Sequence, residues 1–176
     1  MRLHQLKLDY IPEQDRLLLR VSTHNQLEVR LWLTRRALRL LWPRLVQMVS
    51  SSPEIALQSN PEARNALVGM QHEQALSRAN FSKSFDEEPR EMPLGAEPLL
   101  VVNIRTARNS AGRQVLGLLP LRGQGVNLTL DNTLLHSFCK LLQDVVAKSE
   151  WDIVLQLPTL HAATGTVDAS APKTIN

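Results

Sequence analysis

Hydrophobic and polar residues alternate along the first part of the chain in the manner of β-strands. The alternation begins in residues 6–10, and two further apolar runs, residues 16–22 and 27–33, are separated by a short polar turn. A period of two residues is typical of strands with one buried face. The pattern therefore predicts three strands, of which the last two form a hairpin.

The third of these strands has two chemically distinct faces. Leucine and valine occupy one face, whereas Glu28, Arg30 and Trp32 occupy the other. Because the aliphatic face belongs in the core, we expect the second face to point outward. An outward tryptophan between charged residues is a candidate contact surface for another protein, so Glu28, Arg30 and Trp32 are candidate interface residues.

A helix is expected directly after this strand. Thr34 is a good N-cap, and Leu38, Leu41 and Leu45 follow at helical spacing. Pro43 interrupts the pattern, so it either kinks this helix or begins a second one.

The second half of the chain repeats this order of elements. Strands are expected in residues 99–106, 115–121 and 126–130, and Asp131 then caps a helix. Residues 29–49 align with residues 126–146 without a gap, and six of the 21 aligned positions are identical. The alignment predicts an internal duplication of a strand–strand–strand–helix unit.

The segment that joins the halves begins with a clear helix signal. Asn60 is suited to the cap, Pro61 to the first helical position and Glu62 to the first turn. We expect a surface helix to about residue 80, followed by a mobile acidic loop in residues 81–98. A last strand is expected in residues 151–157.

The whole pattern predicts an α+β fold in which two similar halves share one core. A single domain of residues 1–158 would consist of halves 1–50 and 99–158 joined by residues 51–98, and residues 159–176 would form a disordered tail. The order of three strands, two helices, three strands and one helix is similar to that of the dimeric head domains of some scaffold proteins, although no sequence motif accompanies it.

Composition narrows the setting in which the protein works. Cys139 is the only cysteine and cannot form an internal disulfide, which favours a reducing compartment. No run approaches 18 apolar residues, and the first residues lack the apolar block of a signal peptide. We therefore expect a cytoplasmic protein that makes no membrane contact.

The sequence contains no recognisable catalytic or cofactor motif. The five histidines do not have metal-ligand spacing, and no Gly-x-Ser-x-Gly elbow occurs. Cys139 follows His136 by three residues, but its place within an apolar helix favours a buried structural thiol. No catalytic residue, metal or cofactor is therefore expected.

Charge is unevenly distributed although the net charge is only +3. Residues 1–50 are basic and residues 51–100 are acidic. Arg35, Arg36 and Arg39 follow the Thr34 cap, where the helix dipole disfavours cations unless an anion compensates. These three arginines are candidate anion-binding residues, and the anion is either the acidic loop or an external group.

These observations favour a non-enzymatic protein that binds another protein, or a second copy of itself as a homodimer, in an adaptor or scaffold role. The alternative is a nucleic-acid-binding module that uses the arginine cluster.

Overall fold

The computed structural model describes residues 3–79, 81, 84–88 and 90–159, and it is a mixed α+β fold with two sheets and four α-helices. The elements in chain order are β1 (Leu3–Ile11), the 3-10 turn η1 (Pro12–Gln14), β2 (Arg16–Thr23), β3 (Glu28–Leu33), α1 (Arg35–Ser50), α2 (Pro53–Ala56), α3 (Pro61–Arg78), β4 (Leu99–Leu100), β5 (Asn103–Arg108), β6 (Gln114–Leu119), β7 (Val126–Leu130) and α4 (Asn132–Val146).

The first sheet has the order β1-β2-β3-β4. Strands β1 to β3 are antiparallel neighbours, and the short β4 joins β3 in parallel. Leu8, Leu19 and Leu31 lie opposite one another and are buried, so the aliphatic face expected from the sequence faces the core.

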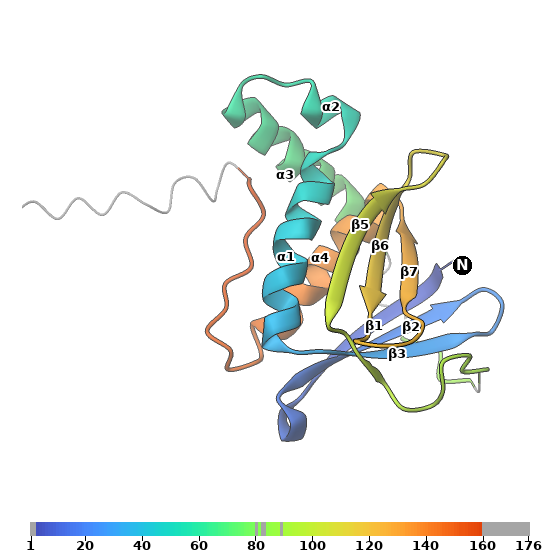
Figure 1. Cartoon of the computed structure of the whole chain (residues 1–176). Helices are drawn as coiled ribbons and strands as arrows, with labels where there is room; N and C mark the ends of the chain where they lie inside the picture. The colour runs from blue at the N-terminus through green and yellow to red at the C-terminus, as the bar shows by residue number, and fades with distance from the viewer. Residues whose placement is uncertain (1–2, 80, 82–83, 89, 160–176) are drawn as a thin grey trace, which may run out of the picture.

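The second sheet has the order β5-β6-β7 and is antiparallel. Its strands run in a clearly different direction from those of the first sheet, and α1 and α4 lie side by side (Figure 1). One hydrophobic core contains residues from both sheets and from all four helices.

The single strand predicted in residues 99–106 is two strands that belong to different sheets. The N–H of Val101 donates to the carbonyl of Trp32 in the first sheet, at 3.0 Å, and the N–H of Val102 donates to the carbonyl of Leu119 in the second, at 2.9 Å. A continuous apolar run does not reveal which neighbour each of its residues pairs with, so the prediction missed this change of sheet.

The predicted helix caps are present. Thr34 Oγ1 accepts from the N–H of Ala37 at 3.1 Å, and Asp131 Oδ1 accepts from the N–H of Leu134 at 2.8 Å. The Asn60 side chain caps α3 in the same way. Helix α1 continues through Pro43 as one helix from Arg35 to Ser50, so no second helix begins there.

Helix α4 buries only part of its apolar face. Leu135, Phe138 and Leu142 are buried, whereas Leu134 and Leu141 are only partly buried. The apolar stripe of α4 is wide, because this helix packs against α1 and α3 as well as against β1 and β7. A wide stripe leaves the centre of the buried face undetermined by sequence alone.

Residues 151–157 do not form the predicted strand. Trp151, Leu155 and Leu157 are nevertheless buried. Side chains bind this segment instead of a neighbouring strand: Trp42 Nε1 donates to the carbonyl of Gln156 at 3.2 Å, and Gln143 Nε2 donates to that of Leu155 at 2.8 Å.

The internal duplication is not confirmed. Both halves contain three consecutive antiparallel strands followed by a capped helix, but the first sheet has a fourth strand and longer hairpin strands. The predicted disordered tail lies outside the described residues, apart from Thr159. None of the helices in the described ranges combines the length and hydropathy needed to cross a lipid bilayer.

Candidate interaction surface

Three cations lie in one row across the outer face of the first sheet. Lys7 is opposite Arg20, and Arg20 is opposite Arg30, so strands β1, β2 and β3 each contribute one residue to this basic row. Like charges directly opposite one another across strands are destabilising. The basic row therefore depends on acidic groups that lie close to it.

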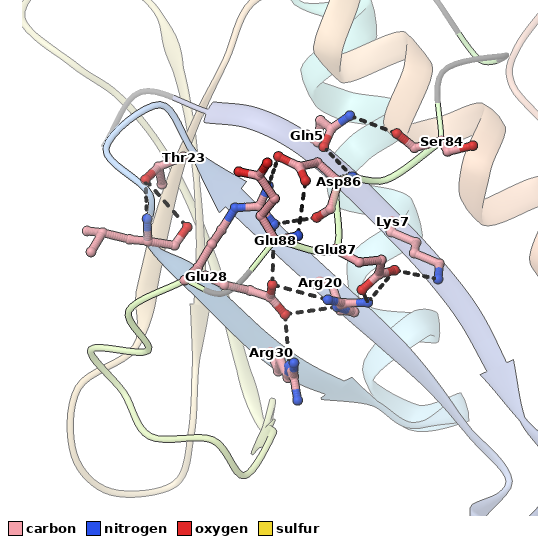
Figure 2. A network of polar contacts seen from close by, with 12 residues as sticks. Gln5, Lys7, Arg20, Thr23, Glu28, Arg30, Ser84, Asp86, Glu87 and Glu88 are labelled. Carbon is pink, nitrogen blue, oxygen red and sulfur yellow. Dashed lines mark hydrogen bonds and ion pairs between the residues drawn. The ribbon is translucent and has the colours of Figure 1, made fainter.

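Glu28 is the first of these acidic groups and is only 2% exposed. Its carboxylate accepts from Arg20 Nε at 2.9 Å and Nη2 at 3.1 Å, and from Arg30 Nε at 2.8 Å. Figure 2 shows Glu28 between the two guanidinium groups. A buried carboxylate loses its hydration, and hydrogen bonds from two cations offset that desolvation cost.

The electrostatics of this cluster favour the ionised states of Glu28 and Arg20. Burial alone would raise the pKa of Glu28, but the hydrogen bonds from Arg20 and Arg30 outweigh it and lower that pKa. The hydrogen bond to Glu28 raises the pKa of Arg20. Glu28 and Arg20 are therefore a charged pair at neutral pH.

The acidic loop supplies the remaining compensation. Glu87 accepts from Arg20 Nη1 at 2.9 Å and from Lys7 Nζ at 3.4 Å, and the hydrogen bond from Arg20 lowers the Glu87 pKa. Arg20 also lies over the ring of Phe85, 4.5 Å from its centroid. We call residues 84–88 the acidic cover, because they lie over the basic row (Figure 2).

Backbone contacts fix the position of the acidic cover on β1. Gln5 Nε2 donates to the carbonyl of Ser84 at 3.1 Å, and Gln5 Oε1 accepts from the N–H of Asp86 at 3.0 Å. Two residues of the predicted mobile loop, Ser84 and Asp86, are therefore bound to β1 by specific contacts. Sequence reasoning missed this docking because the partners are about 80 positions apart along the chain.

Arg90 anchors the loop after the acidic cover. Its side chain is 1% exposed and pairs with Asp86 at 2.7 Å and with Glu28 at 3.6 Å. Glu91 then pairs through its backbone with residues next to β3: the Glu28 N–H donates to the Glu91 carbonyl at 2.9 Å. This anchor is more deeply buried than the acidic cover, since the Glu87 side chain is 58% exposed.

A group of apolar residues on the outer face lies next to the basic row, and Asp9 and Arg16 lie opposite two of its members, Leu18 and Ile11. Leu18, Trp32 and Leu100 are opposite one another on β2, β3 and β4, and Ile11 lies on the same face of β1. None of the four belongs to the core or to the residues packed against it, and Leu100 is 40% exposed. These four residues are the Trp32 patch.

The three predicted interface residues thus have different environments. Trp32 lies in the apolar patch, Arg30 borders it, and Glu28 is buried in the ion-pair cluster. Lys7, Arg20, Phe85, Glu87 and Arg90 also belong to this surface but were not identified from the sequence. Only the charge difference between residues 1–50 and 51–100 pointed to a basic surface under an acidic loop.

The described residues of the acidic loop do not bind the arginine cluster of α1. Arg35 pairs with Asp15 at 3.1 Å and lies over the ring of Trp151. Hydrogen bonds lower the pKa of Asp15, principally the one from Trp151 Nε1. Arg36 and Arg39 are exposed and form no hydrogen bond or ion pair with the described part of the chain.

A histidine pair joins α3 to α4. The Nδ1 atoms of His72 and His136 are 3.1 Å apart, and His136 is fully buried with its Nε2 unpartnered. Burial lowers the pKa of both residues, that of His136 to about 4. Burial also raises the pKa of the Cys139 thiol to about 12, so this thiol stays protonated and unreactive at neutral pH.

No group of three or more potential ligands among His, Cys, Asp and Glu is placed to hold a metal ion within the described ranges. Comparisons of the chain with family models, curated proteins and solved structures found no match.

Proposed function

We propose that this protein is a non-enzymatic interaction or assembly component, in an adaptor or scaffold role, which binds a protein partner through the outer face of the first sheet. The Trp32 patch carries this proposal. An aromatic residue surrounded by aliphatic side chains and bordered by an arginine is the composition typical of energetically important interface residues. The partner is another protein or a second copy of this chain.

The chemistry of the described residues supports a binding role over catalysis. Beside the Trp32 patch, Arg20 and Arg30 are both paired with Glu28. The buried Cys139 thiol stays in its protonated, unreactive form. The single cysteine of the chain also supports a reducing, cytoplasmic setting, which is part of the proposal.

The test compares Trp32→Glu with Val154→Glu. Val154 is an apolar residue that is 78% exposed and lies outside the Trp32 patch, so it controls for a new surface charge. Tagged full-length proteins would be isolated from native cells with and without nuclease, and their masses in solution measured by light scattering. We expect wild type and Val154→Glu to bind the same protein partner in a fixed ratio, or to form the same dimer. Trp32→Glu should lose this partner, or this dimer. An unchanged complex in Trp32→Glu would contradict the proposal.

Nucleic-acid binding is a second candidate, favoured by one observation. Arg36 and Arg39 are exposed and unpaired within the described part of the chain, and arginine suits contacts to phosphate. The test is the fluorescence anisotropy of a labelled oligonucleotide at two salt concentrations, with Arg36→Glu/Arg39→Glu and the control Arg105→Glu/Arg122→Glu. Salt-sensitive binding lost only in the first variant would support this function, whereas no binding at low salt would exclude it.

The internal duplication is a further proposal. The shared order of three antiparallel strands and a capped helix supports it. Superposition of β1–α1 on β5–α4 tests it directly, since residues 29–49 should coincide with residues 126–146.

A further inference from the structure

We propose that the basic row is a binding site for an acidic segment of a partner polypeptide, in which an aromatic residue is followed directly by acidic residues, and that the acidic cover occupies this site in the free protein. The inference rests on the proposed function, because it names the chemistry of a partner for the same face of the sheet.

The charge balance of the basic row is the first observation. Three cations lie directly opposite one another across three strands, and the strands themselves supply two acids, Asp9 and Glu28. Glu87 of the acidic cover provides the remaining negative charge. A sheet surface with an excess of cations, neutralised by a segment distant in sequence, has the electrostatics of a site for acidic chains.

The acidic cover shows how such a segment is recognised. The ring of Phe85 lies under the Arg20 guanidinium, and the Glu87 carboxylate, two residues later, binds Arg20 and Lys7. On either side of Phe85, the Gln5 amide binds the backbone carbonyl of Ser84 and the backbone N–H of Asp86. The side-chain contacts select an aromatic residue and an acid, whereas the Gln5 contacts suit any sequence in this extended conformation.

The acidic cover is held by contacts that a competing segment can replace one for one. Its ion pairs with the basic row are made by Glu87, which is 58% exposed, and exposed ion pairs contribute little to stability. Its third ion pair joins Asp86 to Arg90 and lies outside the basic row. Release of Phe85 and Glu87 from the basic row leaves Glu28 bound to Arg20 and Arg30, and Asp86 bound to Arg90. The Glu91 backbone also stays paired at the start of β3. The site therefore opens without disturbing the buried cluster.

The adjoining Trp32 patch extends this site along the strands. Leu18 and Trp32 lie two residues away from Arg20 and Arg30 along β2 and β3, on the same face. A partner segment with an acidic part over the basic row reaches the apolar patch with its neighbouring residues. Charge would then select the partner, and apolar burial would provide most of the affinity.

The test uses purified full-length protein and a fluorescein-labelled peptide with the sequence of residues 81–92 of this chain. In the released variant, Phe85→Ala/Glu87→Gln, the acidic cover has lost the side-chain contacts that Phe85 and Glu87 make with Arg20 and Lys7. We expect the peptide to bind this variant at least about ten-fold more tightly than wild type, because occupation of the site by the cover lowers the apparent affinity. Adding Lys7→Glu to the released variant should weaken binding by about ten-fold or more, and adding Lys148→Glu, a charge reversal outside the site, should not.

Three results would overturn the inference: no binding to the released variant at millimolar peptide, equal affinity for wild type and the released variant, or binding that Lys7→Glu leaves unchanged. Because Lys7 is partly exposed and the buried Glu28 does not bind it, the Lys7→Glu variant keeps the buried cluster. The peptide measurement is independent of the partner isolated with Trp32→Glu. Failure of the peptide alone removes this inference, and retention of the partner by Trp32→Glu removes the proposed function.

Discussion

Acidification to about pH 5 should destabilise the fold through the histidine pair. His136 is buried between α3 and α4, and its Nε2 has no partner. Protonation would place a cation there, facing His72. Within the described ranges, the charges that act on His72 are Lys140, which disfavours its protonation, and Glu73, which favours it. The unfolded chain takes up this proton readily, whereas the folded chain resists it.

The magnitude follows from the difference between the two pKa values of His136. Its pKa is lowered from 6.5 to about 4 in the folded chain. Stability is therefore fully present above the unfolded pKa, decreases as the pH falls below it and levels off below the folded pKa. Proton linkage gives a loss of about 2 kcal/mol from His136 alone between about pH 7.5 and pH 5. His72 adds to the loss in the same direction, since its pKa is also lowered.

Urea unfolding at a series of pH values, followed by circular dichroism, measures this loss. His136→Gln should flatten the pH dependence whatever its effect on stability at neutral pH, and the exposed His24→Gln should keep the wild-type slope. The pKa of Glu28 is lowered, so its ionised state stabilises the fold above the unfolded value of 4.5 and that contribution is lost only at lower pH. Equal slopes for wild type and His136→Gln would refute the reasoning.

Three further predictions concern stability at neutral pH and are measured by urea unfolding. Leu41→Ala and Phe138→Ala should each cost about 2–5 kcal/mol, because both side chains are fully buried, and losses below about 0.5 kcal/mol would contradict the packing. Glu28→Gln should cost about 3 kcal/mol, because it removes the buried negative charge that Arg20 and Arg30 share, whereas Glu87→Gln at the surface should cost less than about 1 kcal/mol. Equal costs would contradict the burial difference. Gly125→Ala should cost about 1–3 kcal/mol, since its Cβ would lie 2.5 Å from a backbone oxygen of β6. An unchanged stability would contradict this close approach of the turn to β6.

Local patterns in the sequence predicted the local structure well. The side chains of Thr34, Asn60 and Asp131 cap helices as expected, because a cap depends on residues within one turn. The alternation in β3 also placed Leu31 and Trp32 on the correct opposite faces.

The candidate site depends on contacts between distant positions, which periodicity does not contain. Alternation gave Glu28 an outward direction but not its burial, because the covering residue, Arg90, comes from 62 positions later in the chain. The basic row was likewise hidden, since the register that places Lys7 opposite Arg20 is set by strand pairing. The pairing of His72 with His136 requires the packing of α3 on α4, which a weak apolar stripe on α3 did not indicate.

The change of sheet between Val101 and Val102 has a consequence for how the molecule unfolds. Two adjacent amides belong to different sheets, and one peptide unit joins them. A disturbance that opens either sheet at this point pulls directly on the other, so neither sheet can melt far while the other stays intact. In native-state hydrogen exchange, these two amides should therefore become deuterated at the same rate and with the same dependence on denaturant, as reporters of a single cooperative unit.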